Sequence, residues 1–449
     1  MDTREHTKAN LQLLREKLDS GRLRSAGIMI RSLHPAEIAR LLESVDLRTR
    51  AVLWEMVGSE DEGDVLVELS DEVRDGLIEE METEEIIAAV DGMEVDDLAD
   101  LLIDLPETVT RNVLQSLDHQ DEERLRQVLA YDEDTAGGLM NVDIVTVRPD
   151  VTLDVVARYL RARGEIPDGT DSIFVVDRDG TYIGSLYLSR VLTHDDDTIV
   201  SSIMSTELMP IPAQTPSMEV VWEFENRDLL SAPVVDDRYH VVGRITVDDV
   251  VDVIREEAEH SLMGAAGLDE EEDMFAPVVK SATRRALWLG INLCTAFLAA
   301  AVVDLFQTTI DKIVLLAVLM PVVPSMGGVA GSQSLVIITR AIALGQIDRT
   351  NAHEILRKEL AVGFLNGIGW AVVVAAFTYL WFGDWRIGGV IAAAMIINLF
   401  VAALAGFIIP LTLKRMRIDP ALAGGVVLTT VTDVVGYMAF LGLGAILLL

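Results

Sequence analysis

One carboxylate stands inside the last apolar stretch of the sequence, LTTVTDVVGYMAFLGLG, at Asp433. A charged side chain at the centre of a membrane span costs about 2.5–3.5 kcal/mol on insertion scales, so this charge needs a partner. The interiors of the apolar stretches contain no lysine or arginine, which leaves a passing cation as the partner. Thr429 and Tyr437 lie one helical turn before and after Asp433, so the three form a polar stripe. The alternative is a neutral carboxylic acid hydrogen-bonded to a threonine or to Asn398.

An earlier apolar stretch, MPVVPSMGGVAGSQSL, is interrupted by residues that weaken a helix. They are Pro321, Pro324, Gly327, Gly328 and Gly331. Proline removes a backbone donor and glycine loosens the backbone, and such breaks are tolerated in a membrane where they line a cavity. Close helix packing through small residues is the alternative. We predict a pore lined by Pro324, Gly327, Gly328, Thr429 and Asp433.

Acidic residues crowd two other parts of the sequence. Residues 51–100 contain 19 acidic residues and one base, Arg74, and Asp96 and Asp100 share a helix face there. A predicted helix, VDDVVDVIREEAEHSLMGAAGL, carries Asp249, Asp252, Glu256, Glu257 and Glu259. Like charges at helical spacing repel each other, and facing acidic surfaces need cations to screen them. We interpret both regions as surfaces for hydrated cations, with a solvated acidic face as the alternative.

Charge is distributed so unevenly that the two parts of the chain must lie in different solvents. The 449 residues carry a net charge of −36, although half of them are hydrophobic. Residues 1–279 contain 64 acidic and 24 basic residues, net −40, and residues 280–449 contain 8 and 12, net +4. The acidic part would repel nucleic acid and concentrate cations.

Several functional signatures are missing from the sequence. The one cysteine, Cys294, excludes an intramolecular disulfide, and the charged N-terminal segment lacks the apolar core of a cleaved signal peptide. No nucleophile–base set, P-loop or His/Cys metal motif is present, so we do not expect an enzyme.

Five apolar stretches follow Lys280, each close to the roughly 20 residues that span a bilayer. We place them at about residues 285–305, 313–341, 360–382, 387–411 and 421–448. One side of these spans carries Lys280, Arg284, Arg285, Arg340, Arg349, Arg357, Lys358, Lys414, Arg415 and Arg417. The other side carries only Lys312 and Arg386. The positive-inside rule predicts a multi-pass protein of the plasma (inner) membrane, with its N-terminus in the cytoplasm and its C-terminus outside.

Residues 140–260 contain an internal duplication. Ser172-Ile-Phe-Val-Val-Asp177 matches Ser231-Ala-Pro-Val-Val-Asp236, and Gly184 matches Gly243 at the same offset. Each half reads as a strand, a helix, two short strands and a helix. The pair resembles tandem CBS modules, regulatory units that often bind adenosine nucleotides.

The second half of this duplication contains a candidate nucleotide site. Its Thr246 and Asp249 resemble a Gly-x-x-Thr-x-x-Asp stretch, in which threonine contacts phosphate and aspartate the ribose. Tyr187 and Arg190 stand at those positions in the first half. The resemblance implies at most one such site in the CBS pair, with ATP as its candidate ligand.

The stretches MGGVAGSQ and DPALAGGVVLTTVTD make the chain resemble the MgtE family of Mg²⁺ channels over nearly its whole length. The resemblance implies a multi-domain membrane protein with an all-α N-terminal superhelical domain, α/β tandem CBS domains, a connecting plug helix and a five-helix α transmembrane domain. We place these parts at residues 1–135, 136–246, 247–279 and 280–449. Short amphipathic segments in residues 1–130 agree with a helical first part.

The resemblance also implies roles for particular acids. The family's last span has an aspartate that holds hydrated Mg²⁺ in the pore, and Asp433 stands at its place. The family's cytosolic Mg²⁺ sensor corresponds to Asp96, Asp100, Asp228, Asp248, Asp249, Asp252 and Glu257, with Glu256 and Glu259 as substitutes. Departures from the family pattern at Pro216, Met218, His260, Ser261 and Val329 remove or shift some of the family's ligands.

We therefore predict a homodimeric Mg²⁺ channel in membrane lipid, with Mg²⁺ as both the transported and the regulatory ion. Five spans are few for a pore, so two chains would pair with their Asp433 carboxylates facing one axis. Mg²⁺ loses its water reluctantly, so these carboxylates would hold a hydrated ion. A secondary transporter and a membrane-anchored receptor without transport are the alternatives, and oxygen ligands also suit Co²⁺, Ni²⁺ or Mn²⁺.

Overall fold

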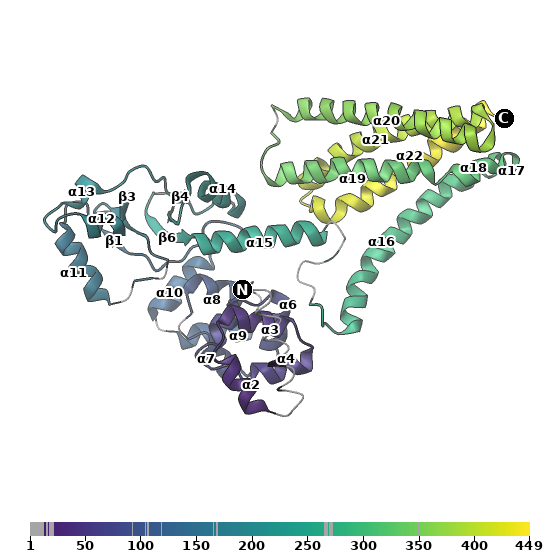
Figure 1. The fold of residues 1–449 in the computed structure, drawn as a ribbon. Coiled ribbons are helices and arrows are strands. Elements are labelled where there is room, and N and C mark those ends of the chain that lie inside the picture. The colour runs from purple at the N-terminus through teal and green to yellow at the C-terminus, as the bar shows by residue number, and fades with distance from the viewer. Residues whose placement is uncertain are drawn as a thin grey trace. The chain divides into compact units, whose positions relative to one another are not determined.

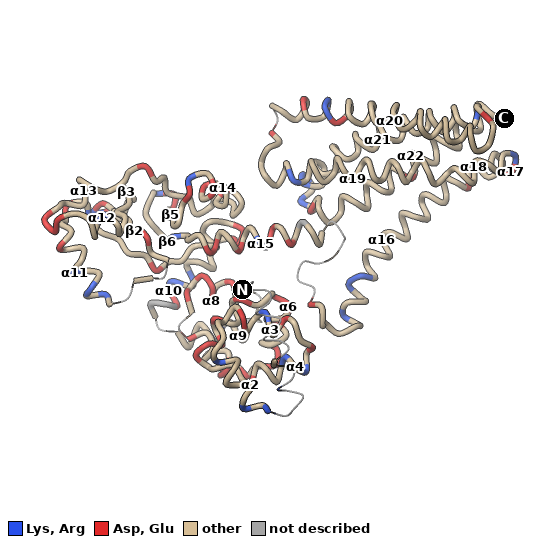
Figure 2. The backbone as a smooth tube through the Cα atoms, in the orientation of Figure 1, with Lys and Arg blue, Asp and Glu red and all other residues tan. Residues whose placement is uncertain are grey.

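The computed structural model divides the chain into two compact units (Figure 1). The acidic unit comprises Met1–Glu256 and Glu271–Ala276, and the apolar unit comprises Glu257–Glu270 and Pro277–Leu449. The structure describes residues 13–14, 17, 22–91, 93–103, 105, 107–117, 119–164, 166–167, 169–264, 268, 273–348 and 350–449. In Figure 2, Asp and Glu mark most elements of the acidic unit and few of the apolar unit. The division follows the predicted change of solvent along the chain.

The acidic unit begins with short helices joined by tight connections. They are α2 (Leu23–Ile30), α3 (Pro35–Glu43), α4 (Leu47–Trp54), α5 (Glu62–Val67), α6 (Asp71–Ile78), α7 (Thr83–Ala89), α8 (Val95–Ile103), α9 (Glu107–Ser116) and α10 (His119–Val128). Local sequence fixes their starts, as at α4, where the Asp46 carboxylate accepts hydrogen bonds from the N–H groups of Arg48 and Thr49. The predicted all-α N-terminal part is confirmed.

Two three-stranded sheets of the same topology follow and confirm the duplication. Each has one parallel and one antiparallel pair, in the orders β1 (Thr146–Val147), β2 (Ser172–Val176), β3 (Tyr182–Tyr187) and β4 (Ile211–Pro212), β5 (Ser231–Val235), β6 (Val241–Thr246). Ser172 lies opposite Tyr187 as Ser231 lies opposite Thr246, and the register shifts at the same place in both pairs. The helices are α11 (Leu153–Arg163), α12 (Leu188–Thr193), α13 (Val200–Ile203), α14 (Ser217–Arg227) and α15 (Val247–Gly264).

The matched glycines of the two repeats mark places where another chain segment approaches closely. A Cβ on Gly184 would lie 2.6 Å from Ser205 O, and one on Gly243 would lie 2.9 Å from Asn141 O. In both repeats the residue after the glycine pairs with that crossing segment through backbone hydrogen bonds. A side chain at either position would therefore push the segments apart.

One hydrophobic core joins the N-terminal helices to the second repeat. Leu98 of α8 and Val250 of α15 both belong to it, together with Ile245 of β6. The first repeat has a separate core around Ile173 and Val156. Because α8 and α15 share one core, their acidic side chains are brought close to each other.

Among its described residues, the apolar unit contains five helices that are long and apolar enough to cross a membrane, as predicted. Its elements are α16 (Val278–Asp304), α17 (Gln307–Lys312), α18 (Val314–Leu319), α19 (Val322–Ala343), α20 (Ala352–Phe382), α21 (Trp385–Arg415) and α22 (Pro420–Leu447). The second span consists of α18 and α19, and the break between them falls at Met320–Pro321. Arg349, one of the basic residues used to predict the orientation, lies outside the described residues.

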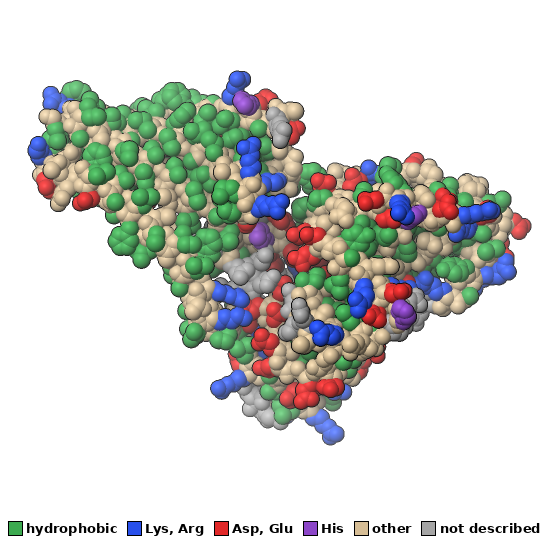
Figure 3. Space-filling view, turned by 180° about the vertical axis from the view of Figure 1, so that it is seen from behind, with side chains coloured by type: hydrophobic (Ala, Val, Ile, Leu, Met, Phe, Trp, Pro, Cys, Tyr) green, Lys and Arg blue, Asp and Glu red, His purple; other side chains and the backbone are tan. Residues whose placement is uncertain are grey.

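Helix α21 is the central helix of this unit, since it packs against α19, α20 and α22. In its most apolar stretch 56% of the residues are buried, against 11% in α16. Hydrophobic side chains cover most of the visible surface of the apolar unit in Figure 3, with Lys and Arg at its ends. The surface of α16 is therefore available to lipid or to another protein chain.

Candidate cation sites

Asp433 lies in α22, whose start is fixed by another aspartate. The Asp419 carboxylate accepts hydrogen bonds from Ala421 N at 2.9 Å and Leu422 N at 3.1 Å, and Pro420 occupies the first helical position. The prediction that Asp419 starts the helix is confirmed. Further along α22, the polar stripe consists of an exposed Thr429 and a half-buried Asp433 and Tyr437.

The Asp433 carboxylate has no hydrogen bond or ion pair with any residue that the structure describes. The donors that sequence analysis considered for it are engaged elsewhere. Thr429 Oγ1 donates to Gly425 O at 2.9 Å, and Asn398 Nδ2 donates to Val323 O at 2.8 Å. These contacts do not support a carboxylic acid kept neutral by threonine or Asn398.

The glycines of α19 lie where other helices approach closely. A Cβ on Gly327 would overlap the Asn398 amide, and one on Gly331 would lie 2.8 Å from Leu428 Cδ1. These contacts favour the helix-packing alternative at both glycines. A Cβ on Gly328 would have only Thr432 Oγ1 near it, at 3.9 Å. The pore-lining roles of Pro324, Gly327, Gly328 and Thr429 stay predictions.

Helix α20 contains a buried carboxylate that was not among the predicted site residues. Glu359 is 5% exposed and accepts a hydrogen bond from Ser334 Oγ of α19 at 2.7 Å. The sequence predicts the third span from about residue 360, which leaves Glu359 in the preceding connection beside Arg357 and Lys358. The apolar residues directly after Glu359 are the signal that could have placed it inside the helix.

In the acidic unit, α8 and α15 bring carboxylates from distant parts of the sequence together. This acidic cluster consists of Glu94, Asp96, Asp97 and Asp100 on one side and Asp248, Asp249, Asp252 and Glu256 on the other. Glu94 and Asp97 were not among the predicted ligands, although Asp97 lies at helical spacing from Asp100. Metal binding by these residues stays a prediction.

Burial and mutual repulsion perturb the acidic cluster. Burial, then the charge of Asp249, raises the pKa of Asp96, which is 8% exposed, well above its ordinary value. Burial and the charge of Glu94 raise the pKa of Asp97 to about 7. Burial with the charge of Asp97 raises the pKa of Asp100 to about 7, although part of Asp100 is exposed. Burial also raises the pKa of Asp249 to about 6. Asp97 and Asp100 are therefore only partly ionised near neutral pH unless another cation stabilises their charge.

Few groups in the described residues compensate this charge. Asn141 Nδ2 donates to Asp96 Oδ1 at 3.2 Å and to Glu94 Oε2, and the positive charge of Arg74 lowers the pKa of Asp100. Among the described residues, no three Asp, Glu, His or Cys side chains are arranged to hold a metal ion directly.

Thr246 and Asp249, the candidate nucleotide residues, contact each other at the start of α15. Asp249 Oδ2 accepts hydrogen bonds from Thr246 N at 2.8 Å and Thr246 Oγ1 at 3.0 Å. A carboxylate three residues into a helix that bonds back to the preceding N–H stabilises the helix start. Asp249 thus caps α15 and belongs to the acidic cluster at once.

Three predicted ligands are not counted in the acidic cluster. Asp228 is exposed and ends α14 in the left-handed conformation, with φ 52°. Glu257 and Glu259 follow along α15 but belong to the apolar unit.

The departure at His260 has a defined contact within the apolar unit. His260 Nε2 lies 2.9 Å from Asp419 Oδ2, and the pair is ionic when the imidazole is protonated. A Cβ on the nearby Gly264 would lie 3.3 Å from Ala421 Cβ, so the end of α15 packs on the start of α22. The side chain of Ser261 lies outside what the structure describes.

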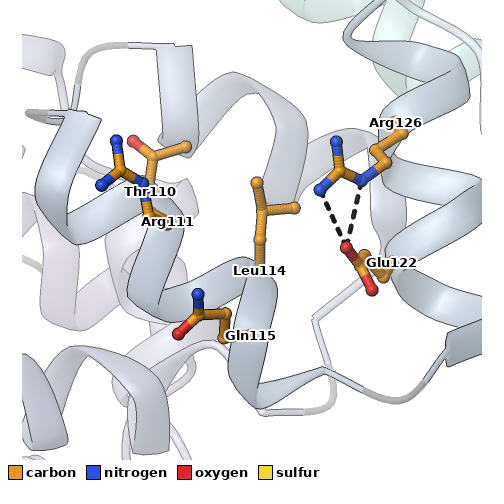
Figure 4. Close-up of a pocket in the computed structure, with 6 residues that line it drawn as sticks. All are labelled: Thr110, Arg111, Leu114, Gln115, Glu122 and Arg126. Atoms are coloured by element: carbon orange, nitrogen blue, oxygen red, sulfur yellow. Dashed lines mark hydrogen bonds and ion pairs between the residues drawn. The ribbon is translucent and has the colours of Figure 1, made fainter.

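Two open grooves in the N-terminal helices differ in their relation to the acidic cluster. A groove of about 290 Å³ includes Asp100, Asp132 and Glu133 in its lining. A groove of about 520 Å³ lies between α9 and α10, lined by Thr110, Arg111, Leu114, Gln115, Glu122 and Arg126 (Figure 4). Arg126 donates from Nε and Nη2 to Glu122 Oε1, at 3.1 and 2.9 Å, so its charge is already neutralised. We assign no function to the larger groove.

Family models match the chain in the order that the sequence predicted. A model described as "MgtE intracellular N domain" matches residues 33–134, and CBS domain models match residues 136–197 and 200–256. A model described as "Divalent cation transporter" matches residues 320–443, which include Asp433.

Curated relatives and a solved structure agree with these matches. The chain is 28% identical to a magnesium transporter of Thermus thermophilus, over 97% of this chain and 98% of the relative. It is 26% identical to a magnesium transporter of Bacillus subtilis, over 95% and 94% of the two chains. The cytosolic domain of an Mg²⁺ channel, solved in complex with ATP, is 29% identical over 54% of this chain and 98% of that one, with a TM-score of 0.50.

Proposed function

Since this chain belongs to the MgtE family of divalent cation transporters, we propose that it carries Mg²⁺ across a membrane along a pathway that includes Asp433. One observation carries the proposal: Asp433 is a carboxylate inside an apolar helix, with no hydrogen bond or ion pair to a described residue. A desolvated carboxylate without a partner attracts a cation, and the relatives named as magnesium transporters support Mg²⁺ as that cation.

The transport mode that fits best is a channel formed by two chains. The chain is a multi-pass membrane protein, and α16 leaves most of its apolar surface uncovered within one copy. Pairing two copies would bring two Asp433 carboxylates to one axis, where they would hold a hydrated Mg²⁺ without stripping its water. The basic connections between spans support an N-terminus in the cytoplasm and a C-terminus outside.

Internal Mg²⁺ would regulate this channel through the acidic cluster. Without the ion, its carboxylates repel across the space between α8 and α15. Mg²⁺ entering the cluster would remove the repulsion and draw the two helices together, and α15 continues directly into the apolar unit. The shift in gating can be no larger than the preference of Mg²⁺ for the closed arrangement.

ATP binding at the CBS pair extends the regulatory proposal. The solved relative that binds ATP supports it, as do Thr246 and Asp249. Their mutual hydrogen bonds would have to be exchanged for contacts with phosphate and ribose. A melting temperature unchanged by ATP, in the presence and absence of Mg²⁺, would contradict this part.

Flux through purified protein in liposomes tests the transport proposal. Asp433→Asn removes the charge and keeps the shape, and we expect Mg²⁺ flux to fall by about tenfold or more, because the pathway loses its counter-charge. Asp311→Asn is the matched control, an exposed acid of α17. Wild-type flux and selectivity in Asp433→Asn would exclude the proposed pathway. A steep dependence on a proton gradient would replace the channel with a secondary transporter.

Mg²⁺ titration of the cytoplasmic region, residues 1–279, tests the proposal that internal Mg²⁺ regulates the channel. A ligand that binds the folded state stabilises it by RT ln(1 + [L]/Kd), about 1.4 kcal/mol when the ligand is at tenfold its Kd. We expect a higher melting temperature and a smaller scattering radius in millimolar Mg²⁺ than in chelator at matched ionic strength. Identical curves in the two conditions would refute a sensor.

A further inference from the structure

Asn398 lies at the junction of three helices in the apolar unit. It belongs to α21, it is fully buried, and its Nδ2 donates to Val323 O of α19 at 2.8 Å. That carbonyl lies in the first turn of α19, directly after the break between α18 and α19. Pro324 has no N–H there that could donate a hydrogen bond back across the helix break. Asn398 therefore ties α21 to the part of α19 that lacks one of its own backbone hydrogen bonds.

Two glycines make room for the Asn398 side chain. A Cβ on Gly327 would overlap its amide group, with Asn398 Cγ at 2.9 Å. A Cβ on Gly436 of α22 would lie 3.0 Å from both Asn398 Nδ2 and Pro324 Cγ. Gly436 follows Asp433 by three residues, less than one helical turn. The same amide group thus lies against the broken helix and against the helix that carries Asp433.

The other polar atom of this amide argues that Asn398 does more than fill space. Asn398 Oδ1 is buried and has no hydrogen-bond partner among the described residues. An unpaired buried acceptor costs about 1–3 kcal/mol, a cost that leucine, which has a similar shape, would avoid. The benefit of asparagine must come from the hydrogen bond to Val323 O.

We propose that Asn398 is a positioning residue for the cation pathway. Its hydrogen bond to Val323 O sets how far α19 stands from α22 beside Asp433, and this distance sets the space for a hydrated ion. The inference rests on the proposed function, since Asn398 acts only through Asp433. A hydrated ion is selected by the dimensions of the space around it, so a change of this separation alters selectivity more than it alters folding.

Asn398→Leu in the full chain is the direct test, because it keeps the branched arrangement of heavy atoms and removes both polar atoms. We expect a melting temperature at or above that of the wild type. We also expect the ratio of Mg²⁺ to Ca²⁺ flux to fall by about fivefold or more, since small misplacements at a site cost up to about 100-fold. A wild-type flux ratio in this variant would overturn the inference.

A second pair of variants separates positioning from packing. Gly327→Ala should lower the melting temperature, because its methyl group displaces the Asn398 amide. Combining it with Asn398→Ala makes room for the methyl group, so the double variant should regain the melting temperature but not the flux ratio. Gly369→Ala in α20, where an added Cβ would meet nothing within 4 Å, is the matched control.

Recovery of the flux ratio in the double variant would mean that Asn398 only fills space, which also overturns the inference. Asp433→Asn distinguishes a failure of the proposed function from a failure of the role inferred for Asn398. If Asp433→Asn keeps wild-type flux, the proposed function has failed. If Asp433→Asn loses flux while Asn398→Leu behaves as wild type, only the role of Asn398 has failed.

Discussion

In the acidic unit the carboxylates of two helices lie close together, whereas Asp433 and Glu359 of the apolar unit have different surroundings from each other. The charge of Asp249 raises the free-energy cost of ionising Asp96 across two helices, and a cation that enters between them would lower this cost. Asp433 has no neighbouring carboxylate in its own chain among the described residues, and Glu359 is bonded to Ser334. A crowded cluster responds in a graded way to cation concentration and pH. A single carboxylate depends on the geometry of the helices that hold it.

The largest expected effect comes from neutralising the acidic cluster. The variant Asp97→Asn/Asp100→Asn/Asp252→Asn spares the helix cap at Asp249 and the Asn141 bond of Asp96. We expect channel closure by internal Mg²⁺ to lose its concentration dependence or to need about tenfold more Mg²⁺, about 1.4 kcal/mol of lost coupling. Patch recordings at several internal Mg²⁺ concentrations measure this effect.

The matched control for that variant changes the net charge equally at another place. Asp195, Asp196 and Asp197 are exposed acids before α13, and replacing all three by asparagine should leave the inhibition curve unchanged. If both triple variants shift the Mg²⁺ inhibition curve by the same amount, the net charge of the acidic unit governs gating. The acidic cluster would then have no role that other exposed acids lack.

The second prediction concerns a buried base of the acidic unit. Arg50 Nη1 lies 2.8 Å from Asp273 Oδ2, and the two side chains are 3% and 4% exposed. Asp273 precedes the first span, and its N–H donates to Glu72 Oε2 at 2.6 Å. Arg50→Met leaves a buried carboxylate without its counter-charge, so we expect residues 1–279 to lose about 3–5 kcal/mol of unfolding free energy.

Denaturant unfolding measures this loss, with Arg126→Met as the control. Arg126 pairs with Glu122 at the surface, where its side chain is 63% exposed, so its replacement should cost at most about 1 kcal/mol. Equal losses in the two variants would show that the Arg50–Asp273 pair contributes no more than a surface pair.

The third prediction is an inverted pH dependence of stability in the acidic cluster. Aspartate in an unfolded chain has a pKa of about 3.9, whereas burial raises the pKa of Asp97 and Asp100 to about 7 and that of Asp249 to about 6. Between these values the folded state binds more protons than the unfolded state, so stability falls as pH rises from about 4 to 7.

Without Mg²⁺, residues 1–279 should therefore melt higher at pH 6 than at pH 8. We expect a difference in melting temperature of about 2–4 °C, which corresponds to about 1 kcal/mol in a region of this size. A larger difference is not expected, because solvent screens the charge of the partly exposed Asp100. Mg²⁺ should reduce the difference by neutralising the same carboxylates. The difference should also shrink in the Asp97/Asp100/Asp252 triple variant, and its persistence there would place the titrating groups elsewhere.

The sequence predicted the elements whose signal is local. Apolar length located five spans, and the repeated Ser172 and Ser231 segments located two sheets with the same register. Asp433 was selected as a candidate site residue because a lone charge in an apolar run costs free energy unless it has a partner. These features need no knowledge of which surfaces meet.

Features that depend on packing between distant segments could not be predicted from the sequence. Asp97 joins the acidic cluster because α8 and α15 share one core, and the core was not visible in either helix alone. The sequence favoured a pore-lining break at Gly327, and helix packing gained support there only once Asn398 was seen to lie against this glycine. Glu359 was missed because charged neighbours hid the true start of α20, seven residues earlier at Ala352.

The smallest expected effect separates the two membrane carboxylates. Glu359→Gln removes a charge and keeps an oxygen that can accept the Ser334 hydroxyl, whose bond to Glu359 is 2.7 Å long. Glu359 is 5% exposed and its hydrogen bond joins α20 to α19. Because glutamine can keep this hydrogen bond, we expect Mg²⁺ flux to change by less than about twofold. Asp433→Asn, which removes the same charge from a carboxylate without such a bond, should lower flux strongly in the same assay. A loss of flux in Glu359→Gln as large as that in Asp433→Asn would place Glu359 in the ion pathway. The presence or absence of a hydrogen bond to a membrane carboxylate would then no longer identify the residues of the pore.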